Sequence, residues 1–143
     1  MNLGPEERLR RVPPVSEATG PCSAGDRYAS LLGIVALSAD PGVAQAAMTL
    51  AEHHLNDIGR AHGGALFSLA DATVALAANA DAREQAVVTI GQLQLVRAAE
   101  QGERLVATAV REFRLRRRAG YRVRITCGEE LVAVGTGETL VIS

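Results

Sequence analysis

The segment 65–80, ALFSLADATVALAANA, most constrains what this chain can fold into. It is rich in Ala and Leu, contains neither Pro nor Gly, and carries Asp71 as its single charged residue. This composition predicts a helix of about four turns. Because apolar side chains surround it on nearly all sides, we expect the helix to be buried rather than to lie on a surface. Another part of the chain must therefore wrap it.

The residues before this helix predict a short helical stretch and a hairpin. Residues 26–32 are compatible with one or two helical turns, with Asp26 as the N-cap. Residues 33–39 and 43–50 are apolar, strand-compatible runs. They are joined by Asp40-Pro41-Gly42, and a Pro-Gly pair between two such runs is typical of a hairpin turn.

The residues after the helix predict an antiparallel sheet. Four strand-like runs are separated by turn signals: 86–96, 104–113, 121–127 and 131–142. The predicted fold class is therefore α+β, with an antiparallel β-sheet wrapped around one long central helix. The chain length of 143 residues fits a single domain over 26–143. The Pro- and Gly-rich segment 1–25 is expected to be a flexible N-terminal tail.

Composition excludes several classes of function. Fifteen basic residues, all of them Arg, against sixteen acidic residues give a net charge of −1, which argues against a nucleic-acid partner. The absence of Lys excludes Schiff-base chemistry and a P-loop. Cys22 and Cys127 form no metal-ligand pattern, so we expect no metal and no cofactor. The chain has neither a membrane-spanning apolar run nor a secretory signal, so we expect no membrane partner and a cytoplasmic location.

A polar loop that runs into the helix forms the candidate catalytic site. Asn56 and His62 bring polar side chains to the helix start, where Gly63 and Gly64 follow. A helix start offers unpaired backbone N–H groups and partial positive charge, which suit a developing oxyanion. The glycines allow a substrate carbonyl to approach these N–H groups closely. Asp71 follows about two turns later on the same helix.

Each of these residues also has a purely structural interpretation. A Gly-Gly pair before a helix is commonly a turn, His62 can cap the helix, and Asn56 can be an ordinary loop residue. Asp71 needs a specific explanation, because a carboxylate in an apolar helix must be paired, protonated or used in chemistry. An ion pair with an arginine would satisfy it, and three arginines are possible partners: Arg60, Arg83 and Arg97. The residues alone leave both interpretations of Asp71 open.

The pattern N-x-x-G-x-x-H-G-G-A-L-x-x-L-A-D, which runs from Asn56 to Asp71, resembles the hotdog-fold acyl-CoA thioesterases of the PaaI-like, phenylacetate-degradation family. The similarity covers residues 28–142 and includes Leu32-Gly33-Ile34 and Val88-Thr89-Ile90. It implies the hotdog fold, in which two protomers share each active site. This chain departs from the pattern at Ala98, where many relatives have Pro.

The resemblance implies roles for the three residues at the helix start. Gly63 would supply the backbone N–H that polarises the thioester carbonyl. Gly64, beside it, would belong to the substrate-binding residues. His62 would help to place the leaving thiolate.

The resemblance also assigns the remaining candidates. Asp71 would be the catalytic carboxylate, either attacking the carbonyl or activating a water molecule. Asn56 of the other protomer would hold that water or orient the acyl carbonyl. Thr89 falls where related enzymes carry a Ser or Thr hydroxyl that helps to position the water or the carboxylate.

The activity that follows is hydrolysis of an aryl or medium-chain acyl-CoA to a free acid and coenzyme A, which is part of the substrate rather than a cofactor. One alternative is a non-catalytic acyl-CoA-binding hotdog module. Another is a hotdog dehydratase or hydratase, although that chemistry typically uses a Pro-Gly loop that is missing here. We expect a homodimer or homotetramer, because a small sheet cannot both wrap an apolar helix and cover its own edges.

The arginine-rich run 114–118, RLRRR, is denser than the family pattern requires. It is either a solvated strand end or a landing site for the phosphates of coenzyme A, since arginine pairs well with phosphate oxygens. The sequence favours the solvated strand end.

Overall fold

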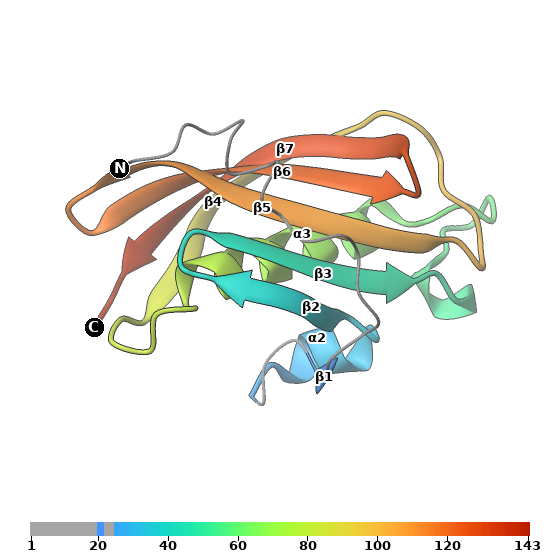
Figure 1. The fold of residues 1–143 in the computed structure, drawn as a ribbon. Coiled ribbons are helices and arrows are strands. Elements are labelled where there is room, and N and C mark those ends of the chain that lie inside the picture. The colour runs from blue at the N-terminus through green and yellow to red at the C-terminus, as the bar shows by residue number, and fades with distance from the viewer. Residues whose placement is uncertain (1–19, 22–24) are drawn as a thin grey trace.

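One antiparallel sheet wraps one long helix in the part of the chain that the structure, a computed structural model, describes: residues 20–21 and 25–143 (Figure 1). The helices are α2 (Arg27–Leu31), the single-turn η1 (Glu52–His54) and α3 (Gly63–Ala78). The strands are β1 (Gly20–Pro21), β2 (Val35–Asp40), β3 (Val43–Thr49), β4 (Ala86–Leu95), β5 (Arg104–Leu115), β6 (Arg118–Cys127) and β7 (Glu130–Val141). This arrangement confirms the predicted α+β architecture. None of the described helices is long and apolar enough to cross a membrane.

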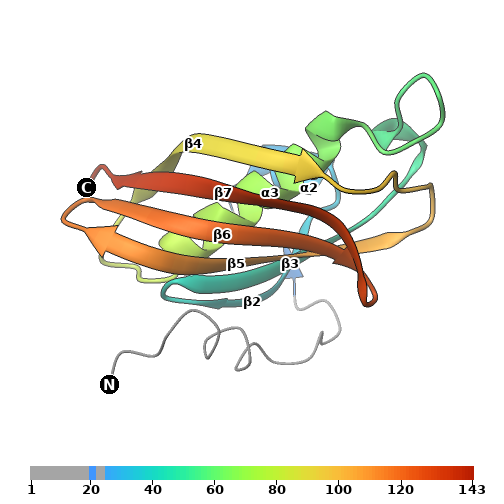
Figure 2. The ribbon, with the colours of Figure 1, turned by 90° about the horizontal axis from the view of Figure 1, so that it is seen from above.

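The strand order places one long strand at an exposed edge. The order is β1-β2-β3-β5-β6-β7-β4, and every neighbouring pair is antiparallel. The helix α3 lies along the inner face of the curved sheet, as Figure 2 shows from above, and packs mainly against β3, β5 and β4. The strand β4 therefore has α3 on its inner face and no hydrogen-bonded neighbour along its outer edge among the described strands.

The strands β2 and β3 form the predicted hairpin. Asp40 pairs with Val43 across the turn, and Gly42 between them has a φ of 86°, a conformation that favours glycine. The Gly42 N–H donates to the carbonyl oxygen of Ala77 at 3.0 Å. This hydrogen bond ties the tip of the hairpin to the C-terminal end of α3.

Side-chain alternation explains why the later segments become strands. In β6, Tyr121, Val123 and Ile125 are buried, whereas Arg122 and Arg124 between them are exposed. The buried side chains join the core that also contains the inner face of α3. A strand with one apolar and one charged face must turn the apolar face toward the helix, which fixes its register.

The helix α3 differs from the prediction in its bounds and in its burial. It begins at Gly63, two residues before the predicted start, because His62 caps it. It ends at Ala78, two residues before the predicted end, where the Asn79 side chain donates to the carbonyl oxygen of Ala75. The expected burial on all sides is wrong for a single chain: Phe67 is 41% exposed, and Asp71 is also exposed. The sheet covers only one side of the helix, so the side with Phe67 and Asp71 stays at the surface.

The predicted flexible tail, residues 1–25, lies mostly outside the described residues and stays a prediction. Within it, Gly20 and Pro21 form β1, whose backbone pairs with Ala36 and Val35 of β2.

His54 anchors the loop that leads to α3. Its buried ring accepts a hydrogen bond at Nδ1 from the Ala51 N–H at 2.9 Å, and Nε2 lies 2.8 Å from the carbonyl oxygen of Leu32. Nε2 is therefore the donor, and the ring is neutral. The His54 carbonyl in turn accepts from the His62 N–H at 2.8 Å. Burial lowers the pKa of His54, although the bond to Leu32 opposes this shift.

We expect His54→Ala to lower the free energy of unfolding by roughly 2–4 kcal/mol, because it removes two hydrogen bonds and leaves a cavity. The pKa of folded His54 is depressed, so its contribution is present above the unfolded value of 6.5 and is lost as the pH falls below it. Urea unfolding at about pH 7.5 and about pH 5 should therefore show the gap between parent and variant narrowing at the lower pH. The exposed neighbour provides the control, since His53→Ala should change stability by less than about 0.5 kcal/mol. A gap of equal size at both pH values would contradict this account.

Candidate active site

The start of α3 leaves one backbone donor available. An α-helix has four N–H groups at its start that lack partners within the helix. At the start of α3 these belong to His62, Gly63, Gly64 and Ala65. The His62 N–H donates to the His54 carbonyl oxygen at 2.8 Å, the Ala65 N–H to the His62 carbonyl oxygen at 2.9 Å, and the Gly64 N–H to the His62 side chain at 2.8 Å. The Gly63 N–H is the remaining one, and it has no partner among the described residues. Gly63 is therefore the donor that a substrate oxygen can reach.

His62 acts as the N-cap of α3. Its Nδ1 accepts from the Gly64 N–H, so this arrangement requires an unprotonated Nδ1 and leaves Nε2 as the donor. A Cβ at Gly64 would lie only 3.0 Å from Nδ1, so a larger residue there would crowd the ring. The cap also occupies the N–H of Gly64, which is therefore not free for substrate. The structure gives His62 a structural role beside the catalytic one that the resemblance implies.

Asn56 is oriented by its own loop. Its Oδ1 accepts from the N–H groups of Ile58 and Arg60 at 3.1 and 3.0 Å, and its backbone N–H donates to the Arg60 carbonyl oxygen at 2.7 Å. The two donors fix the amide orientation, so Nδ2 is the group left to donate to a ligand. Asn56 lines a cavity of about 300 Å³ together with Leu95 of β4, against which Gly63 also packs. We call this the Asn56 cavity.

Asp71 lines a different cavity, on the open side of α3. This Asp71 cavity measures about 280 Å³, and its walls include Asp26 and Tyr28 from the region of α2 and Phe67 and Ser68 from α3. The Asp71 carboxylate makes no hydrogen bond or ion pair with any residue that the structure describes.

The arginines considered as partners of Asp71 are all paired elsewhere. Each binds another carboxylate: Arg60 with Glu100 at 3.4 Å, Arg83 with Asp81 at 2.7 Å, and Arg97 with Glu103 at 2.8 Å. The ion-pair interpretation of Asp71 is therefore wrong within the described chain. An unpaired carboxylate in a cavity is a candidate for chemistry.

A second carboxylate, Asp26, acts on Asp71. Asp26 caps α2 as predicted, accepting from the Ala29 N–H at 2.8 Å. The pKa of Asp71 is raised, first because the cavity walls desolvate the carboxylate although solvent still reaches it, and second by the negative charge of Asp26. The sequence offered no signal for this pair, because the two residues are 45 positions apart and meet only in the fold.

Thr89 lies at a bulge in β4. Val88 pairs with Thr139 and Ile90 with Glu138, so Thr89 between them has no pairing partner. Its hydroxyl donates to the Glu138 carbonyl oxygen at 3.4 Å. Bulges are common beside active sites, where they redirect side chains. The cleft between α3 and β4 that Asp71 lines includes Val88 but not Thr89, so a single chain does not bring Thr89 to the carboxylate.

The predicted site residues thus form two groups within one chain. Asn56, His62 and Gly63 gather around the start of α3, whereas Asp71 lies eight residues further along the helix. At 1.5 Å per residue this separation is about 12 Å. The Asn56 cavity and the Asp71 cavity have no lining residue in common.

Two of the four arginines in the arginine-rich run are paired with carboxylates. Arg114 binds Glu84 at 2.6 Å, and Arg118 binds Glu138 at 3.0 Å. The described residues also contain no cluster of three His, Cys, Asp or Glu side chains that could hold a metal ion.

Comparisons with known proteins identify the family. The sequence pattern of the Thioesterase superfamily matches residues 58–134. A Deinococcus radiodurans protein named as an esterase is 46% identical over 103 residues, which cover 72% of this chain and 69% of that protein. The acyl-coenzyme A thioesterase PaaI of Escherichia coli is 39% identical over 84 residues, 59% of each chain.

Solved structures extend the likeness to the fold. The Escherichia coli PaaI protein from the phenylacetic acid degradation operon has a TM-score of 0.79 at 32% identity, covering 83% of this chain and 86% of its own. A variant of the phenylacetic acid degradation protein PaaI from Thermus thermophilus has a TM-score of 0.76 at 37% identity, covering 80% of this chain and 98% of its own. The chain belongs to the thioesterase superfamily, as a PaaI-like hydrolase with the hotdog fold.

Proposed function

We propose that this protein hydrolyses the thioester of acyl-CoA, with Asp71 as the catalytic carboxylate. The observation that carries the proposal is the Asp71 carboxylate, which lines a cavity and has no hydrogen bond or ion pair with a described residue, on a helix whose first N–H group has no described partner either. The PaaI relative from Escherichia coli is an acyl-coenzyme A thioesterase by name, which supports the same substrate class.

The chemistry needs three groups around the thioester. The Gly63 N–H donates to the carbonyl oxygen and stabilises the negative charge that develops there. Asp71 either takes a proton from the attacking water or attacks the carbonyl itself, forming an anhydride that water then cleaves. Asn56 Nδ2 donates to the water or to the acyl carbonyl. In the first route water adds to the carbonyl and its oxygen ends in the product carboxylate. In the second route the C–S bond breaks as the anhydride forms, and water then cleaves the anhydride to the acid and restores Asp71. In both routes the thiolate of coenzyme A leaves and takes up a proton that comes from the water.

We further propose that each site is built from two chains. A hydrogen-bond donor must lie about 3 Å from the oxyanion, whereas Gly63 and Asp71 of one chain are about 12 Å apart along α3. A second copy can bring its Asn56 and Gly63 to the Asp71 cavity of the first. The open edge of β4, with Ile90 51% and Leu95 50% exposed, offers the surface for such a homodimer.

His62 and Thr89 have supporting roles beside Gly63, Asp71 and Asn56. His62 holds the start of α3 in shape by capping it, and its Nε2, which has no partner among the described residues, is available to the leaving thiolate. Thr89, displaced by the bulge, is positioned to contact the site from β4 of one chain once the second chain is in place. Coenzyme A enters as part of the substrate.

We expect Asp71→Asn to reduce turnover of acyl-CoA by about 10²-fold or more, because it removes the charge that attacks or activates water. The variant should be as stable as the parent or more stable at neutral pH. The raised pKa of Asp71 means that ionisation is less favourable in the folded chain than in the unfolded chain, and Asn removes this cost. Thiol release and melting temperature are to be measured on one preparation, with exposed Asp40→Asn as the control. A destabilised variant whose folded fraction retains the parent rate would end the catalytic assignment.

We expect Asp26→Asn to shift the acid limb of kcat/KM to lower pH. Asn is as good an N-cap as Asp, so α2 should keep its start while the negative charge near Asp71 is lost. The charge of Asp26 helps to raise the pKa of Asp71, so its removal lets Asp71 ionise at a lower pH. The pH profile of thiol release from parent, Asp26→Asn and Asp40→Asn measures the effect. If the acid limb of Asp26→Asn stays at the parent pH or moves to higher pH, Asp26 does not raise the pKa of Asp71.

A further inference from the structure

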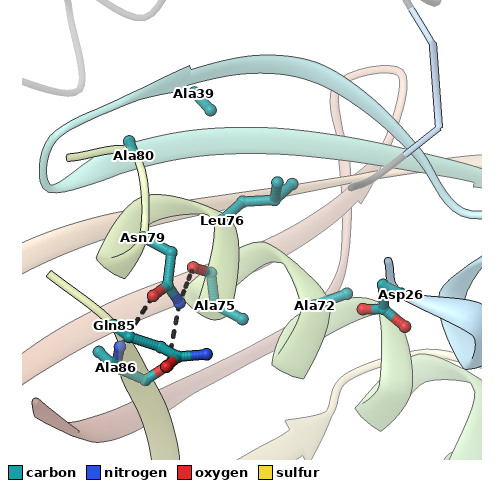
Figure 3. Close-up of a pocket in the computed structure, with 9 residues that line it drawn as sticks. All are labelled: Asp26, Ala39, Ala72, Ala75, Leu76, Asn79, Ala80, Gln85 and Ala86. Atoms are coloured by element: carbon teal, nitrogen blue, oxygen red, sulfur yellow. Dashed lines mark hydrogen bonds between the residues drawn. The ribbon is translucent and has the colours of Figure 1, made fainter. Parts of the chain in front are cut away.

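Another cavity lies beside the Asp71 cavity, on the same side of α3, and measures about 300 Å³ (Figure 3). It lies between the C-terminal half of α3, the end of β2 and the start of β4. Small apolar side chains make up most of its wall: Ala39 from β2, Ala72, Ala75 and Leu76 from α3, and Ala86 from β4. This volume is at the lower end of the range of small-molecule sites, which are also mostly apolar. We call it the alanine cavity.

The alanine cavity continues the Asp71 cavity. Asp26 and Ala72 line both of them, so the two cavities meet at these residues. From Ala72 to Asn79, which also lines the alanine cavity, the helix rises by about 10 Å. Together the two cavities form a groove along α3 that begins at the candidate catalytic carboxylate and runs toward the C-terminal end of the helix.

Several polar groups around the alanine cavity are hydrogen-bonded within the protein, and the Asp26 carboxylate lies where this cavity meets the Asp71 cavity. The Asn79 Nδ2 donates to the carbonyl oxygens of Ala75 and Ala86 at 2.9 and 3.0 Å, and its Oδ1 accepts from the Ala86 N–H at 2.8 Å, as Figure 3 shows. The Gln85 Oε1 accepts from the Ser143 hydroxyl at 3.3 Å. A ligand in this cavity therefore meets mostly hydrocarbon surface, which suits an apolar group.

On the side of Asp71 that faces β4 there is little space. The cleft between α3 and β4 has a volume of only about 20 Å³. The Phe67 ring fills it, because a Cβ on Gly91 of β4 would lie only 2.8 Å from the ring. Beyond the Asp71 cavity itself, the alanine cavity is therefore the space lined by described residues into which an acyl group can extend when its carbonyl is at Asp71.

We propose that the alanine cavity receives the acyl chain, and that Ala75 in its wall limits the length of chain accepted. The ligand is an unbranched aliphatic acyl group of medium length, because the groove is long and its wall is apolar. This inference rests on the proposed thioesterase function for the position of the carbonyl.

The test is to fill the cavity and to compare substrates of different length. Ala75→Leu adds an isobutyl group to the wall and keeps a good helix former in α3. The ratio of kcat/KM for octanoyl-CoA to that for acetyl-CoA should fall about tenfold or more, because each methylene accommodated in an apolar pocket is worth about that factor. Ala82→Leu, at an exposed position outside the cavity, is the matched control and should leave the ratio unchanged. An unchanged ratio in folded Ala75→Leu would overturn the proposal.

A second variant and a binding measurement separate the possible failures. If Ala75→Leu fails to fold, Ala39→Val takes its place in the same experiment. Ala39 is an exposed position of β2 that lines the cavity, and a β-branched residue suits a strand. Calorimetry with the S-octyl thioether of coenzyme A, which cannot be hydrolysed, measures binding without turnover. If the parent binds the thioether tightly and Ala75→Leu weakens this binding about tenfold, the result supports the alanine cavity as the acyl site. If the parent in addition hydrolyses no thioester, that second result refutes only the proposed function. Hydrolysis of octanoyl-CoA with equal binding of the thioether by parent and variant refutes only the cavity.

Discussion

The rise of α3 controls how this protein can assemble a catalytic site. Gly63 begins the helix and Asp71 lies eight residues later, so the backbone donor and the carboxylate are held about 12 Å apart on one rigid element. The same helix is covered by the sheet on one side only, which leaves Phe67 and Asp71 at the surface. The edge of β4 is also without a neighbour among the described strands. A second copy of the chain would complete the site, cover the open side of α3 and pair the edge.

Hydrogen bonds made within the loop decide which polar groups remain for a substrate. The His62 ring takes the N–H of Gly64, so that Gly63 keeps the available donor at the helix start. The Asn56 oxygen accepts from two backbone N–H groups, so that Nδ2 is the group left to donate to a ligand. Buried His54 holds this loop against the α2–β2 connection. Residues that look purely structural therefore orient the groups to which we assign the chemistry.

Local features of the fold could be predicted from the sequence, whereas long-range contacts could not. The hairpin at Asp40-Pro41-Gly42 and the cap at Asp26 follow from neighbouring residues, and both are confirmed. The start of α3 was missed by two residues because Gly63 and Gly64 are poor helix formers, and the His62 cap outweighs their propensity. The partners of Arg60, Arg83 and Arg97, the approach of Asp26 to Asp71 and the alanine cavity depend on tertiary packing, which no local pattern encodes.

In the proposed dimer, one active site takes Asp71 from one chain and Asn56 from another. Mixing two inactive variants tests this sharing. Asn56→Asp keeps an oxygen for the N–H groups of Ile58 and Arg60 but lacks the Nδ2 donor, and Asp71→Asn lacks the carboxylate. Co-expressed or co-refolded in equal amounts, the two variants should recover roughly a quarter of the parent rate of thiol release, because half of the dimers are mixed and each mixed dimer has one intact site. A mixture whose mass shows mixed dimers but whose rate equals only the sum of the two inactive variants would contradict a site shared between chains.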